Sequence, residues 1–480
     1  MADVKLPAVW MQSFLGEIAE DISYGYTAAS TTEEIGPRML RITDIQDNSV
    51  DWDSVPFCKI DSHRELKYLL SEGDLVFART GATVGKSYLI KGNVPSAVYA
   101  SYLIRVRCSK EIYISYLSHF FNAPTYWGQI TEFSSGIGQP NVNGTKLKGL
   151  LIPIPSLAEQ KVIAEKLDTL LAQVDSAKTR LGQIPQILKR FRQSVLAAAV
   201  SGKLTEEWRK DNLPLTEFNY CDVKTSPIPD DEKYFDEPEC WLWCNLGSIV
   251  KLINGDRGKN YPNQSEYVEE GVPFINTGHI DPDGTLSLTR MNFITQEKYE
   301  ILGSGKILEN DLVYCLRGAT MGKTAKVYPF LVGAIASSLV IVRPSRHILT
   351  DYCYYFLISP EAKFLIKKFD NGSAQPNLSA KSLSSYPIAL PSLEEQTEIV
   401  RRVEQLFAYA DTIEKQVQDA LLRVNNLTQS ILAKAFRGEL TEQWRAENPD
   451  LISGENSAEA LLAKIKAERE TVKPKKKSAK

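Results

Sequence analysis

The chain is poor in the residues that build metal centres, disulfide frameworks and membrane spans. Its seven cysteines are scattered and odd in number, which predicts reduced thiols in a cytoplasmic protein. The four histidines are dispersed, and no set of cysteines and histidines has the spacing of a zinc site, so we expect no metal site. No run approaches the roughly 18 apolar residues that a membrane-spanning helix needs, and residues 1–20 lack the pattern of a signal peptide.

An excess of charge is missing as well. The formal net charge is -3, so bulk charge gives no indication of nucleic-acid binding, and any such surface must come from local clusters. Hydrophobic residues make up 43% and charged residues 24%, which is typical of a globular protein with sizeable cores. At roughly 150 residues per domain, 480 residues predict about three units.

The second half of the chain repeats the first. Residues 194–209 and 430–445 are identical at ten of sixteen positions, at an offset of 236. The motif P-S-L-x-E-Q at 155–160 recurs at 391–396 with the same offset, and GATVGK at 81–86 recurs as GATMGK at 318–323. The repeat predicts a duplicated architecture with an internal pseudo-two-fold.

Each half contains a long heptad pattern. Apolar residues recur in alternating steps of four and three, which is typical of a coiled-coil seam. The members are Ile163, Leu167, Leu170, Val174, Ala177, Leu181, Ile184, Leu188, Phe191 and Val195, and Ile399, Val403, Leu406, Ala410, Ile413, Val417, Ala420, Val424, Leu427 and Ile431. We expect two antiparallel helices whose seams, of about 50 Å each, bury one another, with a kink at Pro185 in the first. An ordinary helical bundle or a dimerisation hairpin would show the same periodicity.

The segments before each heptad pattern have the size of single domains and alternate strand-like and helical runs. Residues 75–78 and 312–315 are strand-like, as are 102–106 and 339–342, and helical segments follow them. The predicted fold class is therefore mixed α/β, with two heads joined by two long antiparallel coiled-coil helices. The predicted domains are a first head at 1–155, a central helical region at 156–210, a linker at 211–238, a second head at 239–390, a distal helical region at 391–445 and a tail at 446–480.

Each head carries one basic segment. In residues 73–110 and 310–347, lysines and arginines outnumber the single aspartate, giving net charges of +5 and +4. Because lysine and arginine supply most of the sequence-independent affinity for DNA, we predict contacts from Arg79, Lys86, Arg105, Arg317, Lys323 and Arg343. A solvated charged face is the alternative for either segment alone.

The repeated GATVGK motif resembles a phosphate-binding loop but lacks its spacing. A P-loop needs glycine five residues before the Gly-Lys pair, and that position holds Thr80 in one copy and Arg317 in the other. ATP binding is therefore not expected here. The motif predicts a tight turn after a strand that exposes backbone amides and a lysine, either as a DNA contact or as a plain surface turn.

Two further positions are candidate DNA contacts. Gln139 and Asn141, with Gln375 and Asn377 in the second copy, could bind adenine edges, or their amides could cap a local turn. Arg41 corresponds to Asn276, so the heads differ at a candidate contact, as two readers of different sequences would.

No catalytic constellation is recognisable in the sequence. There is no Gly-x-Ser-x-Gly elbow and no dinucleotide fingerprint. A duplicated chain with basic heads and no catalytic residues is interpreted as a recognition module.

These motifs together resemble the specificity subunit of type I restriction–modification systems. Each variable head holds the glycine turn and a QPN loop and is followed by P-S-L-x-E-Q and a heptad pattern. The helical segments EKLDTLLAQVDS and RRVEQLFAYADTIEKQV are similar to the type IA branch, and the resemblance covers nearly the whole chain.

The resemblance implies a noncatalytic reader of double-stranded DNA. Each head would recognise one part of a split, asymmetric site, and the helices would set the gap. Two modification subunits would dock on the chain and methylate adenine with S-adenosylmethionine, and two restriction subunits would add ATP- and Mg²⁺-dependent translocation and cleavage. The recognised bases cannot be predicted from sequence, because readout depends on side-chain geometry and DNA shape.

A different class of function remains open from the residues alone. A structural adaptor could pair two protein partners through its helices without reading DNA. Selective binding of a defined duplex over bulk DNA discriminates the two.

Overall fold

The computed structural model describes residues 6–46, 49–81, 83–134, 141–212, 223, 227–235, 238, 240–369 and 377–472. The chain forms two compact units. The first contains residues 1–182 and 419–480, and the second contains residues 183–418. The boundary between the units falls within both predicted helical regions, after residue 182 and after residue 418.

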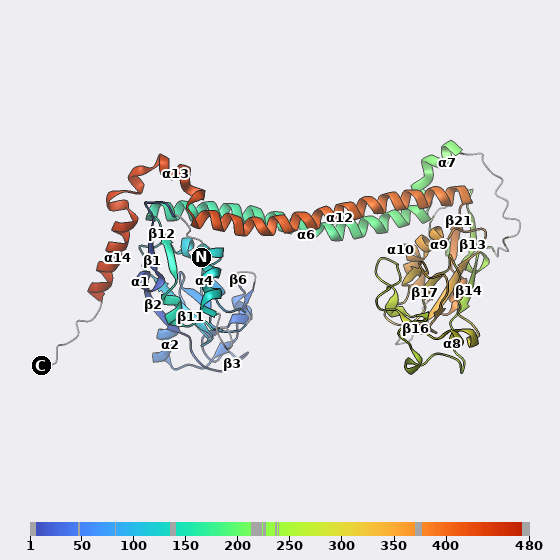
Figure 1. Ribbon diagram of the computed structural model, residues 1–480, viewed down its shortest axis with the longest axis horizontal. Coiled ribbons are helices and arrows are strands. Elements are labelled where there is room, and N and C mark those ends of the chain that lie inside the picture. The colour runs from blue at the N-terminus through green and yellow to red at the C-terminus, as the bar shows by residue number, and fades with distance from the viewer. Residues whose placement is uncertain are drawn as a thin grey trace. The chain divides into compact units, whose positions relative to one another are not determined.

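The first head is built from a four-stranded antiparallel sheet and a smaller mixed sheet (Figure 1). The antiparallel sheet has the order β2 (Ala19–Tyr24), β11 (Leu103–Cys108), β8 (Leu75–Ala78) and β9 (Ser87–Leu89). The mixed sheet has the order β10 (Ala97–Tyr99), β4 (Arg38–Leu40), β7 (Phe57–Cys58) and β3 (Ser30–Thr31). The pairs β1 (Met11–Phe14) with β12 (Leu151–Ile154) and β5 (Ile45–Gln46) with β6 (Ser49–Val50) complete the strands in the described part of this head. Its helices are α1 (Leu15–Ile18), α2 (Ser62–Tyr68), α3 (Ile114–Phe120), α4 (Pro124–Ser134) and α5 (Gly144–Lys148).

The second head repeats this arrangement. Its main sheet has the order β14 (Val250–Asn254), β20 (Leu339–Pro344), β17 (Leu312–Cys315) and β18 (Thr324–Lys326). The smaller sheet has the order β16 (Asn292–Ile294), β15 (Val272–Ile275) and β19 (Ala334–Ile335), and β13 (Leu242–Asn245) pairs with β21 (Pro387–Leu390). The helices are α8 (Gln296–Ile301), α9 (Thr350–Ile358), α10 (Pro360–Phe369) and α11 (Ala380–Ser384). The strands predicted at 75–78 and 312–315 are confirmed as β8 and β17.

The two predicted long helices are α6 (Leu157–Val200) and α12 (Leu393–Phe436), each of 44 residues. In the first unit Lys166 donates to the carbonyl of Leu440 and Lys178 donates to Thr428. In the second unit Arg192 pairs with Asp411, and Arg402 donates to the carbonyl of Leu204. In each unit the partner's number falls as the number along the first helical region rises, so the helices are antiparallel (Figure 1). Residues of both predicted seams are buried or half-buried, with the exception of Leu427, which is 48% exposed. The helix α6 continues through Pro185, and the kink expected there stays a prediction.

A buried carboxylate joins three segments of the first unit. Glu159, in the first turn of α6, accepts hydrogen bonds from Trp10 Nε1 at 2.8 Å and from Thr441 Oγ1 at 2.6 Å. Arg445 Nη1 lies 2.6 Å from the same carboxylate, and its guanidinium lies over the Trp10 ring. This Glu159 cluster connects the start of the head, the start of α6 and the segment that follows α12.

The second unit contains the same cluster with equivalent residues. Glu395 accepts from Trp241 Nε1 at 2.8 Å and from Thr205 Oγ1 at 2.6 Å, and Arg209 Nη1 lies 2.5 Å away. The carboxylates are fully buried in both clusters, where an ion pair needs several hydrogen bonds to offset desolvation. The Glu395 cluster and its counterpart explain why the tryptophan, the glutamate and the L-T-x-x-W-R segment are repeated in the sequence.

The neighbouring residues of the P-S-L-x-E-Q motif attach each head to its helix. Ser156 Oγ and Ser392 Oγ accept the backbone N–H of the glutamate three residues later, which caps α6 and α12. Gln160 Oε1 accepts a hydrogen bond from the backbone N–H of Tyr113 in the first head. Gln396 Oε1 accepts one from the backbone N–H of Leu349 in the second head.

Part of the predicted tail is folded onto the first unit. After α13 (Glu442–Glu447), residues 458–472 form helix α14 (Ala458–Val472), which buries Leu461 and Ile465 in the core of the first head (Figure 1). Arg469 donates to the backbone carbonyls of Gly16 and Glu17. The segment predicted as a tail at 446–480 thus includes a packed helix, because the apolar face of α14 has a partner far away in sequence. The basic segment 473–480 lies outside the described residues.

The predicted linker is also partly folded. Helix α7 (Glu206–Asn212) extends into it, and Tyr234 and Phe235 pack against Trp243 in the second head. Tyr234 also donates to the carbonyl of Pro387 at 2.7 Å. Proline and acidic residues indicated a linker, but the adjacent aromatic side chains give residues 227–235 a place on the core. None of the helices in the described part of the chain has the length and apolar character of a membrane span.

We predict that Leu167→Ala destabilises the first unit by about 2–5 kcal/mol, because a fully buried seam side chain is lost. The matched variant Leu427→Ala, at the exposed position, should change stability by about 0.5 kcal/mol or less. Urea unfolding followed by circular dichroism measures both. Equal effects of the two variants would contradict the assigned seam.

We also predict that Glu159→Ala lowers the stability of the first unit by about 3–5 kcal/mol, because it leaves the Arg445 charge buried without its partner. Glu395→Ala should have the same effect in the second unit. Hydrogen exchange of each unit measures the loss, with Glu165→Ala on the exposed face of α6 as the control. If the protection of backbone amides from exchange stayed unchanged in the unit that carries the substitution, the stabilising role of the glutamate cluster would be contradicted.

Candidate nucleic-acid interface

The glycine motif of the first head forms a tight turn after strand β8. Gly81 and Gly85 have φ of +84° and +81°, a region that favours glycine. A Cβ on Gly85 would also lie 2.7 Å from the Ile130 side chain, so the turn packs closely on the head. The Lys86 side chain is exposed at the end of the turn, as predicted from sequence.

The fold places Asn141 beside this turn. Thr80 forms a β-bridge with Asn141, and the backbone N–H of Val142 donates to the carbonyl of Arg79 at 3.0 Å. Two motifs that are about sixty residues apart in sequence therefore meet. Gln139, the other predicted contact of this loop, lies outside the described residues.

The second head brings its equivalent residues together in the same way. Arg317 forms a β-bridge with Asn377, and the N–H of Leu378 donates to the carbonyl of Leu316 at 2.9 Å. Gly318 and Gly322 have φ of +79° and +86°. Lys323 is exposed, with Nζ 3.4 Å from the carbonyl of Ile280. Gln375 lies outside the described residues.

Arg41 and Asn276 occupy equivalent positions at the ends of β4 and β15. Each begins a short 3-10 turn, Ile42–Asp44 in the first head and Thr277–His279 in the second. The backbone N–H of Arg41 donates to Asp44 Oδ2 at 2.8 Å, and that of Asn276 donates to His279 Nδ1 at 3.1 Å. The correspondence inferred from the repeat thus holds in three dimensions.

Backbone hydrogen bonds connect these positions along one edge of each head. In the first head, Ala100 donates to the carbonyl of Leu40, and Arg79 donates to the carbonyl of Tyr102. In the second head, the backbone N–H of Ala336 donates to the carbonyl of Ile275, and that of Leu316 donates to the carbonyl of Ser338. We call this edge the recognition edge. It holds Arg41, Arg79, Thr80, Lys86, Tyr102 and Asn141 in the first head, and Asn276, Leu316, Arg317, Lys323, Ser338 and Asn377 in the second.

Arg79 is half-buried on the recognition edge and stacks on an aromatic ring. Its guanidinium lies 5.2 Å from the centroid of Tyr24, whose hydroxyl accepts from the N–H of Gly144. Its Nε is buried and has no hydrogen-bond partner among the described residues. No sequence pattern indicated Tyr24 or the exposed Tyr102, because their place on this edge depends on strand pairing.

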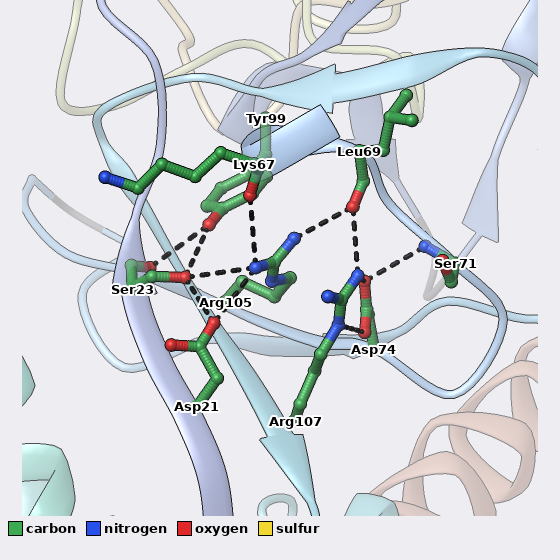
Figure 2. Close-up of polar contacts among 9 residues, drawn as sticks. All are labelled: Asp21, Ser23, Lys67, Leu69, Ser71, Asp74, Tyr99, Arg105 and Arg107. Atoms are coloured by element: carbon green, nitrogen blue, oxygen red, sulfur yellow. Dashed lines mark hydrogen bonds and ion pairs between the residues drawn. The ribbon is translucent and has the colours of Figure 1, made fainter. Parts of the chain in front are cut away.

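Arg105 has a structural role in place of the predicted DNA contact. Its side chain is 3% exposed and pairs with Asp21 at 2.9 Å (Figure 2). It also donates to the carbonyl of Leu69 at 2.8 Å and lies over the Tyr99 ring. A phosphate could reach this guanidinium only if these contacts broke, so we remove Arg105 from the candidate contacts. Burial opposes ionisation of Asp21, but the hydrogen bonds from Arg105 and Ser23 outweigh it and lower the pKa of that carboxyl.

Arg343 is likewise engaged inside its head. Its Nε and Nη2 bind the two carboxylate oxygens of Asp311, both at 2.8 Å, as Arg107 binds Asp74 in the first head. These hydrogen bonds raise the pKa of both arginines. Nη2 of Arg343 also donates to the carbonyl of Lys306 at 3.2 Å, so this side chain is engaged within its head, and its contact with DNA stays a prediction.

The net charges of +5 and +4 already count Asp74 and Asp311. They still overstate the free positive charge, because Asp21 and Asp351, which lie outside the two segments, pair with Arg105 and Lys326.

The described residues contain no group of three or more histidine, cysteine or carboxylate side chains that could hold a metal ion.

The family model described as the type I restriction modification DNA specificity domain matches residues 8–186 and 238–423, one match in each half. The chain belongs to this family of type I restriction–modification specificity subunits. The family inferred from the sequence motifs is thus confirmed.

Individual relatives agree with the family match. The type I restriction enzyme EcoBI specificity subunit of Escherichia coli is 46% identical over 354 residues, 73% of this chain and 71% of the relative. The EcoKI specificity subunit of Escherichia coli strain K12 is 44% identical over 371 residues, 74% of this chain and 71% of the relative.

Solved structures support the fold. One similar chain comes from a study of complex assembly and conformational transition of the type I R-M system, with a TM-score of 0.65 and 21% sequence identity. Another is the HsdS subunit from Thermoanaerobacter tengcongensis, with a TM-score of 0.59 and 21% sequence identity. Each comparison covers 91% of this chain and 99% of the other. The predicted fold class, two mixed α/β heads joined by two long helices, is confirmed.

We predict that Arg105→Ala destabilises the first head by about 1.5–3 kcal/mol, the range for hydrogen bonds to charged groups. The salt dependence of DNA binding should not change, because Arg105 is not available to phosphates. Denaturant unfolding and binding titrations at several salt concentrations measure the two effects. A shallower salt dependence with unchanged stability would contradict the structural role.

Proposed function

We propose that each recognition edge of this specificity subunit binds one half of a two-part DNA site. The observation that carries the proposal is that both heads build the same edge, with an exposed turn lysine beside an asparagine. The backbone N–H groups of Gly85 and Gly322 donate to the carbonyls of Ala78 and Cys315, so the exposed lysine of each turn is the group that can neutralise a phosphate. Phosphate contacts of this kind position a protein on a duplex before its bases are read.

The two-part site follows from the duplication. The heads share a fold but differ at several positions of the edge, so they are suited to different half-sites on one duplex. Helices α6 and α12 connect the heads and would set the gap between the half-sites. The adaptor alternative is not favoured, because family membership and the repeated edge both support DNA reading.

The chain acts without catalysis of its own in this proposal. Two modification subunits would dock on it and methylate adenine with S-adenosylmethionine, and two restriction subunits would cleave DNA with ATP and Mg²⁺. The chain would thus determine the sequence specificity of both reactions in the cytoplasm.

We predict that Lys86→Ala and Lys323→Ala each weaken binding of the assembled complex to its site. Each variant should also make the negative slope of log affinity against log salt concentration shallower by about 0.9, because one phosphate contact is lost. Electrophoretic shifts at a series of salt concentrations measure the slope.

Lys110→Ala is the matched control for this experiment. Lys110 is exposed in the same head but follows the other end of β11, away from Tyr102. The slope should stay unchanged in this variant. A slope that is unaffected in both turn variants would remove these lysines from the interface.

A further inference from the structure

The recognition edges of the two heads share some residues and differ in others. The shared pairs are Gly81 and Gly318, Gly85 and Gly322, Lys86 and Lys323, and Asn141 and Asn377. The differing pairs are Arg41 and Asn276, Asp44 and His279, Arg79 and Leu316, Thr80 and Arg317, and Tyr102 and Ser338. Phosphates are the same in every sequence, whereas base edges differ. Two heads that read different half-sites should therefore share their phosphate contacts and differ where they contact bases.

Among the differing residues, Arg41 has the geometry of a base-reading side chain. Its Nε donates to Asp44 Oδ2 at 3.0 Å and its Nη2 donates to Asp44 Oδ1 at 2.6 Å. Its Nη1 has no hydrogen-bond partner in the described part of the chain. The aspartate thus holds one edge of the planar guanidinium and leaves the edge formed by Nη1 and Nη2 free to donate two parallel hydrogen bonds.

The burial of the pair fits this orientation. The Asp44 side chain is 7% exposed and is fixed further by the backbone N–H of Arg41, whereas the Arg41 side chain is 41% exposed. The carboxylate is therefore an internal support, and the guanidinium faces outward. Because Asp44 neutralises the charge of Arg41, the pair contributes little to sequence-independent attraction of phosphates.

The second head cannot make the same contact. Its equivalent residue, Asn276, uses Oδ1 to accept the backbone N–H of Gly278 at 2.8 Å, and His279 replaces the supporting aspartate. An amide has one acceptor and one donor group in place of the fork of a guanidinium.

We propose that Arg41, oriented by Asp44, reads the O6 and N7 acceptors of one guanine in the half-site of the first head. Arginine in this bidentate geometry is the commonest specific contact to guanine in the major groove. The inference rests on the proposed function, and it makes Asp44 a positioning residue.

The test uses the chain assembled with its modification subunits. Sequencing of modified adenines in a host that expresses the wild-type complex first gives the recognised motif. Each guanine of that motif is then replaced in turn by 7-deazaguanine, which lacks the N7 acceptor, and binding is measured by competition. We expect a loss of about 5- to 150-fold at one guanine for the wild-type complex. Arg41→Ala should abolish that loss at this guanine and leave the effects of all other substitutions unchanged.

Two conservative variants separate base reading from charge and folding. Arg41→Lys keeps the charge but not the planar fork that Asp44 orients, so it should reduce discrimination at the same guanine. Asp44→Asn can still accept the backbone N–H of Arg41, and it should reduce discrimination at that guanine while the other half-site is read as before. The unaffected half-site shows in each case that the complex is folded.

Three results would overturn the inference. They are a motif without guanine, equal sensitivity of wild type and Arg41→Ala to 7-deazaguanine at every position, and full discrimination by Arg41→Lys. A wild-type complex without any sequence preference would instead contradict the proposed function itself.

Discussion

The architecture depends on a buried carboxylate that occurs twice, as Glu159 and as Glu395. Each carboxylate is paired with an arginine from a distant L-T-x-x-W-R segment and with a tryptophan at the start of its own head. Since an uncompensated charge in the core is costly, each head folds with that distant segment in place. The first head is completed by residues that follow α12, and the second by residues that follow α6.

This connection leaves the opposite end of each main sheet free to present the recognition edge. Beyond β8 and β17, positive-φ glycines fix a turn, and a β-bridge fixes the asparagine beside it. The same backbone therefore carries different side chains in the two heads, such as Arg41 and Asn276. A constant scaffold with variable side chains at one edge is suited to reading two sequences with one fold.

The elements with local signals were predictable from sequence. The heptad seams, the strands at 75–78 and 312–315 and the exposed turn lysines all have periodic or composition signals. The bridge between Thr80 and Asn141 and the docking of α14 were not predictable, because they depend on residues far apart in sequence. The ion pairs of Arg105 and Arg343 were not predictable either, because a count of charges does not show which groups are paired. Asp21 and Asp311 hold them inside the heads.

In the function proposed above, one chain reads two separate sequences with two equivalent edges. Sequencing of modified adenines in a host that expresses this chain with its modification subunits tests it most directly. We expect one asymmetric motif with two defined parts separated by a fixed number of unspecified bases. We also expect that changes at Arg41 alter only one part and changes at Asn276 only the other. A continuous motif, or a change at Arg41 that altered both parts, would contradict the account.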